Sequence, residues 1–166
     1  MSPAEVIKRT FIFESLDEKE VADVLKITKE KRFSKGEIIM QEGHEGDTMY
    51  IVVHGTVEVS KTLTMKVGEE STEMEKVLRR FKAEDNVVFG EMAMIDRGNR
   101  SASAVSTTDC ALLEIKREDF LDLIEKRPQM GVKILRRITE LLASRVRQSS
   151  QDVIRLTTAL SIALSS

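Results

Sequence analysis

The sequence predicts an α+β fold, in which an antiparallel β-barrel or sandwich of about eight short strands lies between two helical regions. Three observations support this prediction. Residues 1 to 32 hold helix-capping patterns and apolar residues at helical spacing. Residues 33 to 116 hold short β-rich runs separated by turns, several of which contain glycine. Residues 117 to 166 return to a helical period, so we expect one barrel domain with a helical lead-in and C-terminal helices.

The composition argues against several classes of function. The 166 residues are 41% hydrophobic and 33% charged, which is ordinary for a globular protein. A formal net charge of −2, with 4% aromatic residues and no Trp, argues against a nucleic-acid partner. The one cysteine, Cys110, suits a reducing cytoplasm and, with only His44 and His54, argues against a zinc site. The sequence has neither the long apolar run of a membrane span nor a signal peptide, so we expect no membrane partner.

Two capping patterns mark the predicted N-terminal helices. Ser2 to Glu5 combines a capping box with a proline at the first helical position. Ser15 to Glu18 has the same S-x-x-E pattern and predicts a second helix with Ser15 as its N-cap. The apolar residues that follow this second box at helical spacing are Val21, Val24, Leu25 and Ile27.

The first half of the barrel is predicted to hold three strands. Residues 37 to 41 form a short apolar run after a turn at Lys35-Gly36. Residues 49 to 54 and 57 to 60 are rich in β-forming residues, and only Gly55-Thr56 separates them. Two such runs joined by a tight turn predict a β-hairpin.

The second half of the barrel is less regular. Residues 61 to 75 are polar and mixed, which suits either an exposed hairpin or a loose loop. Strands are expected at residues 76 to 81, 87 to 89, 101 to 106 and 110 to 115, with turns at 82 to 86 and 96 to 99 and one helical turn at 91 to 95.

Two helices are expected after the barrel. The first begins at Arg117 and ends before Pro128, because the residue before a proline avoids helical backbone. The second carries an apolar stripe that either packs on its own barrel or pairs with the same helix of a second chain. Since the stripe is longer than one small barrel covers, we favour a homodimer through this helix. The stripe comprises Val132, Leu135, Ile138, Leu141, Leu142, Val146, Val153, Leu156 and Leu160.

Residues 89 to 104 (FGEMAMIDRGNRSASA) carry the clearest chemistry. Gly90 lets the backbone approach a ligand, and the free amides of a short helix at residues 91 to 95 suit an anion. Arg100 offers a forked, permanently charged donor to a phosphate. Glu91 suits the hydroxyls of a ribose, so the set suits a nucleotide. The alternative is a plain turn with a solvated arginine, and the glycine patterns of nucleoside triphosphatases are missing.

The segment resembles the phosphate-binding cassette of the cyclic-nucleotide-binding domain family, which includes the bacterial catabolite activator and kinase regulatory subunits. The matching residues are Phe89-Gly90-Glu91, Met92-Ala93-Met94 and Arg100-Ser101-Ala102. Earlier barrel positions also match, at Lys35-Gly36-Glu37, Gln41-Glu42-Gly43, Gly46-Asp47, Tyr50-Ile51-Val52 and Gly55-Thr56-Val57. Asn86 stands where the family usually has a glycine, and asparagine is the next most tolerant residue of left-handed backbone.

The resemblance implies a jelly-roll barrel, a C-terminal helical lid and a site for a cyclic nucleotide. Arg100 would bind the oxygens of the cyclic phosphate, and Glu91 would accept a hydrogen bond from the ribose 2′-hydroxyl. Ser101 would bond the phosphate or a guanine base. The backbone amides of residues 90 to 93 would add further donors. The other ligand-binding residues that the resemblance implies are Phe89, Gly90, Met92, Ala93 and Ala102 in the cassette, and Arg145 and Ser149 on the lid.

We therefore expect a regulatory sensor that binds cyclic AMP, or alternatively cyclic GMP, and signals through its C-terminal helices to an unknown downstream protein. No nucleophile is paired with a positioned histidine, so we expect neither an enzyme nor a cofactor. The alternatives are a ligand-free dimerisation module with the same fold and a metal-dependent cupin-like barrel, for which His44 and His54 are too few ligands. With no DNA-binding domain, we expect a free-standing module or a fragment of a larger regulator. The layout looks bacterial.

Overall fold

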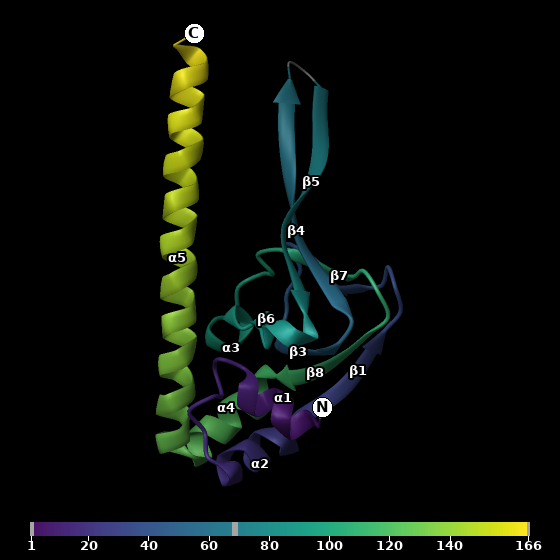
Figure 1. Ribbon diagram of the computed structural model, residues 1–166, viewed down its shortest axis with the longest axis vertical. Helices are drawn as coiled ribbons and strands as arrows, with labels where there is room; N and C mark the ends of the chain where they lie inside the picture. Colours follow the sequence, from purple (N-terminus) through teal and green to yellow (C-terminus); the bar gives the residue numbers. More distant parts are fainter. Residues whose placement is uncertain (1, 68–69, 166) are drawn as a thin grey trace.

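The computed structural model describes residues 2–67 and 70–165; residues 1, 68, 69 and 166 lie outside the described part of the chain. Two β-sheets form the body of the molecule, and helices from both ends of the chain cover one side of it (Figure 1). In chain order the elements are α1 (Pro3–Arg9), α2 (Glu18–Lys26), β1 (Thr28–Phe33), β2 (Ile38–Met40), β3 (Thr48–His54), β4 (Thr56–Val67), β5 (Glu70–Lys82), η1 (Ala83–Asp85), β6 (Val88–Phe89), α3 (Met92–Ile95), β7 (Ser103–Ser106), β8 (Cys110–Lys116), α4 (Arg117–Lys126) and α5 (Pro128–Leu164).

The predicted α+β fold class is confirmed. One sheet has the strand order β1-β8-β3-β6 and the other has the order β2-β7-β4-β5, and every pairing is antiparallel. The strands therefore form two four-stranded sheets of jelly-roll type instead of one continuously hydrogen-bonded barrel.

The predicted hairpin at Gly55 is wrong in its pairing, although both of its strands exist. Strand β3 belongs to the first sheet and β4 to the second, so Gly55 forms a corner between the sheets. Its φ is +86°, and a Cβ at this position would lie 2.4 Å from the backbone oxygen of Asp109. A strand–turn–strand pattern shows where the chain turns, whereas the hydrogen-bond partners depend on strands distant in the sequence.

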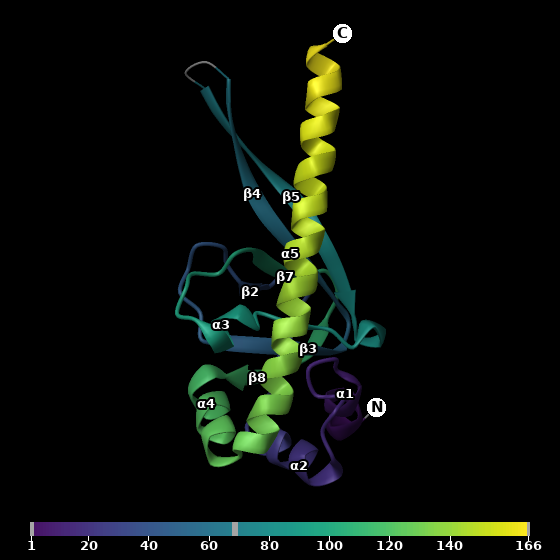
Figure 2. The ribbon, with the colours of Figure 1, turned by 90° about the vertical axis from the view of Figure 1, so that its left-hand side faces the viewer.

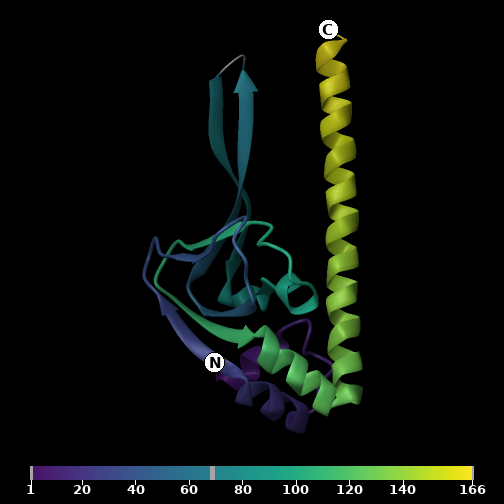
Figure 3. The same cartoon turned by 180° about the vertical axis from the view of Figure 1, so that it is seen from behind.

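The hairpin of this protein is instead formed by β4 and β5. Their register runs from Thr56 opposite Lys82 to Val67 opposite Glu70, with a bulge between Val59 and Ser60. Of the two alternatives for residues 61 to 75, the described part therefore adopts the exposed hairpin. The far part of the hairpin extends beyond the other strands of both sheets, in the same direction as α5 (Figures 1 and 3).

Two boundaries near the N-terminus differ from the prediction. The N-cap of α2 is Asp17 instead of Ser15, because the Asp17 carboxylate accepts hydrogen bonds from the amides of Lys19 and Glu20, both at 2.9 Å. The first strand begins at Thr28, within the region expected to be a helical lead-in. It is an edge strand that pairs only with β8 and has four exposed residues in succession, so it has no apolar alternation to detect.

Buried side chains form two hydrophobic clusters, one on each face of the first sheet. The first cluster joins the sheet to the helices, and the second fills the space between the two sheets. Burial of this apolar surface is the main stabilising contribution to the fold. Fully or nearly fully buried members of the first cluster include Ile7, Phe13, Val24, Ile51, Ile115, Ile134 and Ile138; those of the second include Tyr50, Val52, Val57, Phe81, Phe89 and Leu112.

Helix α5 has a docked part and a projecting part (Figure 2). Near its start, Ile134 and Ile138 are 0% and 1% exposed, and Lys133 pairs with Glu20 of α2 at 2.8 Å. From Val146 onward its large apolar side chains are exposed, and the helix runs on in the same direction as the β4–β5 hairpin (Figure 2). No helix in residues 2–67 and 70–165 is both long and apolar enough to cross a membrane.

Candidate functional site

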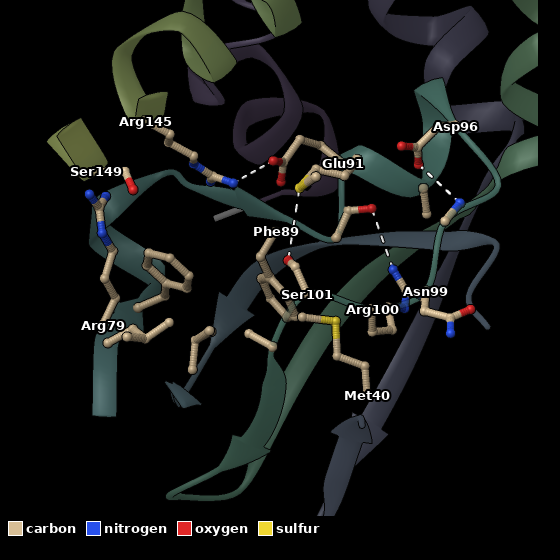
Figure 4. Close-up of a pocket in the computed structure, with 18 of the residues that line it drawn as sticks. Met40, Arg79, Phe89, Glu91, Asp96, Asn99, Arg100, Ser101, Arg145 and Ser149 are labelled. Carbon is tan, nitrogen blue, oxygen red and sulfur yellow. Dashed lines mark hydrogen bonds and ion pairs between the residues drawn. The ribbon is translucent and has the colours of Figure 1, made fainter. Parts of the chain in front are cut away.

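A cavity of about 320 Å³ lies between the segment 89–104, strand β5 and helix α5 (Figure 4). Its wall includes every residue that the sequence indicated for the ligand: Phe89, Gly90, Glu91, Met92, Ala93, Arg100, Ser101, Ala102, Arg145 and Ser149. The structure therefore brings residues from the cassette and from α5 together around one space.

The backbone around Gly90 is shaped by two left-handed residues. Asn86 follows η1 with a φ of 50°, as its place in the sequence suggested, and β6 then pairs with β3 through Phe89 and Tyr50. Gly90 has a φ of +74°, and a Cβ there would lie 2.9 Å from the Thr48 oxygen. The Ala93 amide donates to the Gly90 oxygen at 3.2 Å, and its role as a donor to an anion stays a prediction.

Glu91 is completely buried and has one unsatisfied oxygen. Its Oε1 accepts a short hydrogen bond from Nη1 of Arg145, while Oε2 has no hydrogen-bond partner among the described residues. Burial raises the pKa of Glu91, and the charges of Arg145 and Arg100 oppose that effect. An unpaired carboxylate oxygen in a cavity wall suits a hydroxyl donor.

Arg100 is a buried cation held by neutral groups. Its Nη1 donates to the oxygen of Thr48 at 2.7 Å and to that of Gly90 at 3.4 Å, and its Nη2 donates to Oγ1 of Thr48 at 2.8 Å. Burial lowers its pKa, but the guanidinium stays charged. Over the described ranges, no carboxylate forms an ion pair with Arg100, which is only 9% exposed. A desolvated cation without an acidic partner favours an incoming anion.

Both predicted lid residues line the cavity. Arg145 donates to the Glu91 carboxylate and to the Val88 oxygen, the latter at 3.4 Å, and its contact with a ligand stays a prediction. Ser149 lies one turn further along α5, beside Arg79 of β5 (Figure 4). Ser101 donates weakly to the sulfur of Met92 at 3.8 Å, so its hydroxyl is nearly free for a ligand.

Sequence reasoning missed several residues of the site. Gly46 packs so closely under Arg100 that a Cβ there would lie 1.9 Å from Nε. The match of Gly46-Asp47 to the barrel positions of the family is the signal in the sequence for this contact. Arg79 and Phe81 of β5 also line the cavity, and no local pattern in the sequence shows this. The wall also includes Met40, Val59, Gln148 and Asp152.

The pKa shift of Glu91 predicts a pH-dependent stability difference for Glu91→Gln. Because the pKa of Glu91 is raised in the folded state, protonation of Glu91 favours the folded state. This contribution to stability is complete below the ordinary pKa of 4.5 and is lost as the pH rises through the higher pKa of the folded state. Glutamine stays neutral. The ligand-free variant should therefore melt a few degrees above the wild type at pH 8, and this gap should shrink towards pH 4.5. Thermal melts at pH 4.5, 6 and 8 test this; a wild type that is the more stable at pH 8 contradicts it.

The sequence is similar to known proteins and to one family model. The family model described as cyclic nucleotide-binding domain matches residues 30–127. The cyclic AMP receptor protein of Thermus thermophilus is 31% identical over 147 residues, which are 89% of this chain and 62% of that protein. The cAMP-dependent protein kinase regulatory subunit of Yarrowia lipolytica is 31% identical over 118 residues, 71% of this chain and 28% of that protein. The chain thus spans about three fifths or less of these relatives.

The fold of this chain is also similar to solved structures. The catabolite activator protein of Thermus thermophilus has a TM-score of 0.75 at 30% identity, covering 89% of this chain and 63% of that one. The regulatory domain of Toxoplasma gondii PKA, crystallised with cAMP, has a TM-score of 0.61 at 28% identity, covering 72% of this chain and 42% of that one. Since the family model matches more than half of the sequence, the chain belongs to the cyclic nucleotide-binding domain family.

Proposed function

We propose that this chain is a sensor module whose ligand is a cyclic purine nucleotide, with cyclic AMP favoured over cyclic GMP. The observation that carries the proposal is the buried Arg100, which forms no ion pair with an acid among the described residues and lines the same cavity as Glu91, whose Oε2 is unsatisfied. A cyclic phosphate supplies the missing anion, and a ribose hydroxyl supplies the missing donor. The names of the Thermus receptor protein and of the Toxoplasma complex, which both mention cyclic AMP, support this choice of ligand.

The same contacts suggest how ligand binding changes the position of α5. Arg145 of α5 is held by the carboxylate that is expected to bind the ribose. A ligand hydroxyl on Oε2 of Glu91 would share this carboxylate with Arg145, whose hydrogen bond is to Oε1, and the ligand would also lie near Ser149 of α5. We infer that the signal is a shift of α5 relative to the sheets, passed to a downstream protein. We further propose a binding role without catalysis, and a cytoplasmic location consistent with the free thiol of Cys110.

Titration calorimetry with cyclic AMP, cyclic GMP and cyclic di-GMP tests the proposal. We expect saturable binding of one cyclic nucleotide per chain, with cyclic AMP the tightest. Tighter binding of cyclic GMP would keep the sensor function and change its ligand. Binding of none of the three would overturn the proposal and favour a ligand-free dimerisation module with the same fold.

We also propose that two copies pair through α5. Valines stand at heptad spacing at Val132, Val146 and Val153, with Thr139 at the position between the first two. Leucines stand three positions further on at Leu135, Leu142 and Leu156, with Ser149 at the remaining position. The three valines of this heptad pattern, here called the seam, are 60–67% exposed. The chain's own sheets therefore do not cover the seam at these residues. Valine at the first core position of a heptad and leucine at the fourth suit a parallel two-stranded coiled coil.

Light scattering after gel filtration tests this dimer. The wild type should elute at about 38 kDa, twice the 18.8 kDa of one chain. Val153→Glu, in the C-terminal part of the seam, should shift the protein to the monomer mass, because a charge there is buried on pairing. Ile154→Glu is the matched control: this residue is similarly exposed, at 66% against 60% for Val153, but lies off the seam, so the variant should stay dimeric. A monomeric wild type, or equal dissociation by both variants, contradicts the proposal.

A further inference from the structure

A buried chain of hydrogen bonds lies behind Arg100. The guanidinium donates to the Thr48 hydroxyl at 2.8 Å, this hydroxyl donates to that of Tyr50 at 3.2 Å, and the Tyr50 hydroxyl donates to Oε2 of Glu114 at 3.1 Å. Each of these four residues is no more than 9% exposed. Thr48, Tyr50 and Glu114 are absent from the residues that line the cavity, so this chain of hydrogen bonds lies beneath the cavity wall.

The sheet fixes the positions of these groups. Thr48 and Tyr50 are two residues apart on β3 and so share one face of the strand, and the register of β3 with β8 places Glu114 opposite Tyr50. The ring of Tyr50 is stacked on that of Phe89, with centroids 5.5 Å apart. The hydroxyl of Tyr50 is therefore held by packing as well as by hydrogen bonds.

The chain of hydrogen bonds runs in one direction, from the donor Arg100 to the acceptor Glu114. The Tyr50 hydroxyl donates to Oε2 of Glu114, so its own oxygen remains to accept a hydrogen bond. The Thr48 hydroxyl then donates to Tyr50, and its lone pair remains for Nη2 of Arg100. Hydrogen bonds arranged head to tail in this way strengthen one another in a buried environment.

The bonds to Thr48 leave part of the guanidinium available. Arg100 has five N–H donors, and its bonds to the two oxygens of Thr48 and to the Gly90 oxygen use three of them. Within the described residues, nothing accepts from Nε or from the second hydrogen of Nη2. These two donors lie on one edge of the planar group, which is the arrangement that binds two oxygens of a phosphate.

We infer that Thr48 is a positioning residue for the anion site, oriented by Tyr50 and Glu114, which holds one edge of Arg100 and leaves the other edge for the ligand. This inference rests on the proposed function, because the ligand it serves is the cyclic phosphate. Thr48 acts through Arg100 and does not touch the nucleotide itself.

Calorimetric titration of Thr48 variants with cyclic AMP tests the inference. Thr48→Val keeps the shape and the backbone oxygen but removes the hydroxyl, and we expect about tenfold weaker binding. Thr48→Ser keeps the hydroxyl and should restore nearly wild-type affinity. Thr64→Val, on the exposed part of β4, is the matched control and should change nothing. In an Arg100→Ala background, Thr48→Val should have no further effect, because the residue through which it acts is gone.

A ligand-free measurement separates this inference from the proposed function. Hydrogen exchange of the Arg100 guanidinium, followed by NMR, should be slow in the wild type and in Thr48→Ser, and fast in Thr48→Val. If Thr48→Val matches the wild type in both affinity and exchange, the inference is wrong while the sensor function stands. If the wild type binds no cyclic nucleotide, the function fails, and the exchange rates alone decide whether Thr48 holds Arg100. If Thr48→Val does not fold, Tyr50→Phe, which removes only the orienting hydroxyl, replaces it with the same expected direction.

Discussion

Replacing Arg100 with alanine is expected to weaken cyclic-nucleotide binding by about 10- to 150-fold, the loss that corresponds to a charged hydrogen bond of about 1.5–3 kcal/mol. The physical reason is that Arg100 is the buried cation of the cavity and has no acidic partner among the described residues. Calorimetric titration of the wild type and Arg100→Ala with cyclic AMP measures the difference.

Two further variants sharpen this test. Arg100→Lys keeps the charge but loses the planar fork, so it should recover only part of the affinity. Arg97→Ala removes an exposed arginine from the turn just before Arg100 and should bind like the wild type. Thermal melts of each ligand-free variant exclude loss of the fold as the cause. Unchanged affinity in Arg100→Ala would show that the anion binds elsewhere, and an equal loss in Arg97→Ala would show that only overall charge matters.

Adding a single methyl group at Gly46 is expected to have an effect of similar size. A Cβ there would lie 1.9 Å from Nε and 2.3 Å from Cζ of Arg100, so the guanidinium has to leave its present position. The backbone of Gly46 is not in the left-handed region, so alanine is acceptable to the main chain itself. Gly46→Ala should therefore fold and still bind cyclic AMP about tenfold or more weakly.

The same titration shows whether Gly46 acts through Arg100. In the Arg100→Ala background, Gly46→Ala should cause no further loss, because the side chain that it displaces is absent. Wild-type affinity for Gly46→Ala would mean that Arg100 binds the phosphate from another rotamer. An additional loss in the double variant would mean that the methyl group obstructs the ligand directly.

Local sequence signals predicted the elements and the lining of the cavity well. Capping boxes marked α1 and, within two residues, α2, and the cassette pattern marked Gly90, Glu91 and Arg100, which the structure places around one cavity. These features depend on residues close together in the chain. Asn86 likewise adopts the left-handed conformation expected from its residue type.

Features that depend on distant pairing were not predictable. The corner at Gly55 looked like a hairpin because the turn is local, whereas the choice of sheet for β3 and β4 depends on β8 and β7. The contact of Thr48 with Arg100 spans 52 residues, and no spacing rule reveals it. The same holds for Arg145, which the sequence placed near the ligand but not on the Glu91 carboxylate.

The most direct test of the account compares the affinities of the wild type for cyclic AMP and for its 2′-deoxy analogue. If the phosphate lies on Arg100 and the ribose hydroxyl on the unsatisfied oxygen of Glu91, cyclic AMP binds and the analogue binds about tenfold or more weakly, because a buried carboxylate oxygen is again left without a donor. Equal affinities, or no binding of cyclic AMP, would contradict this placement of the nucleotide.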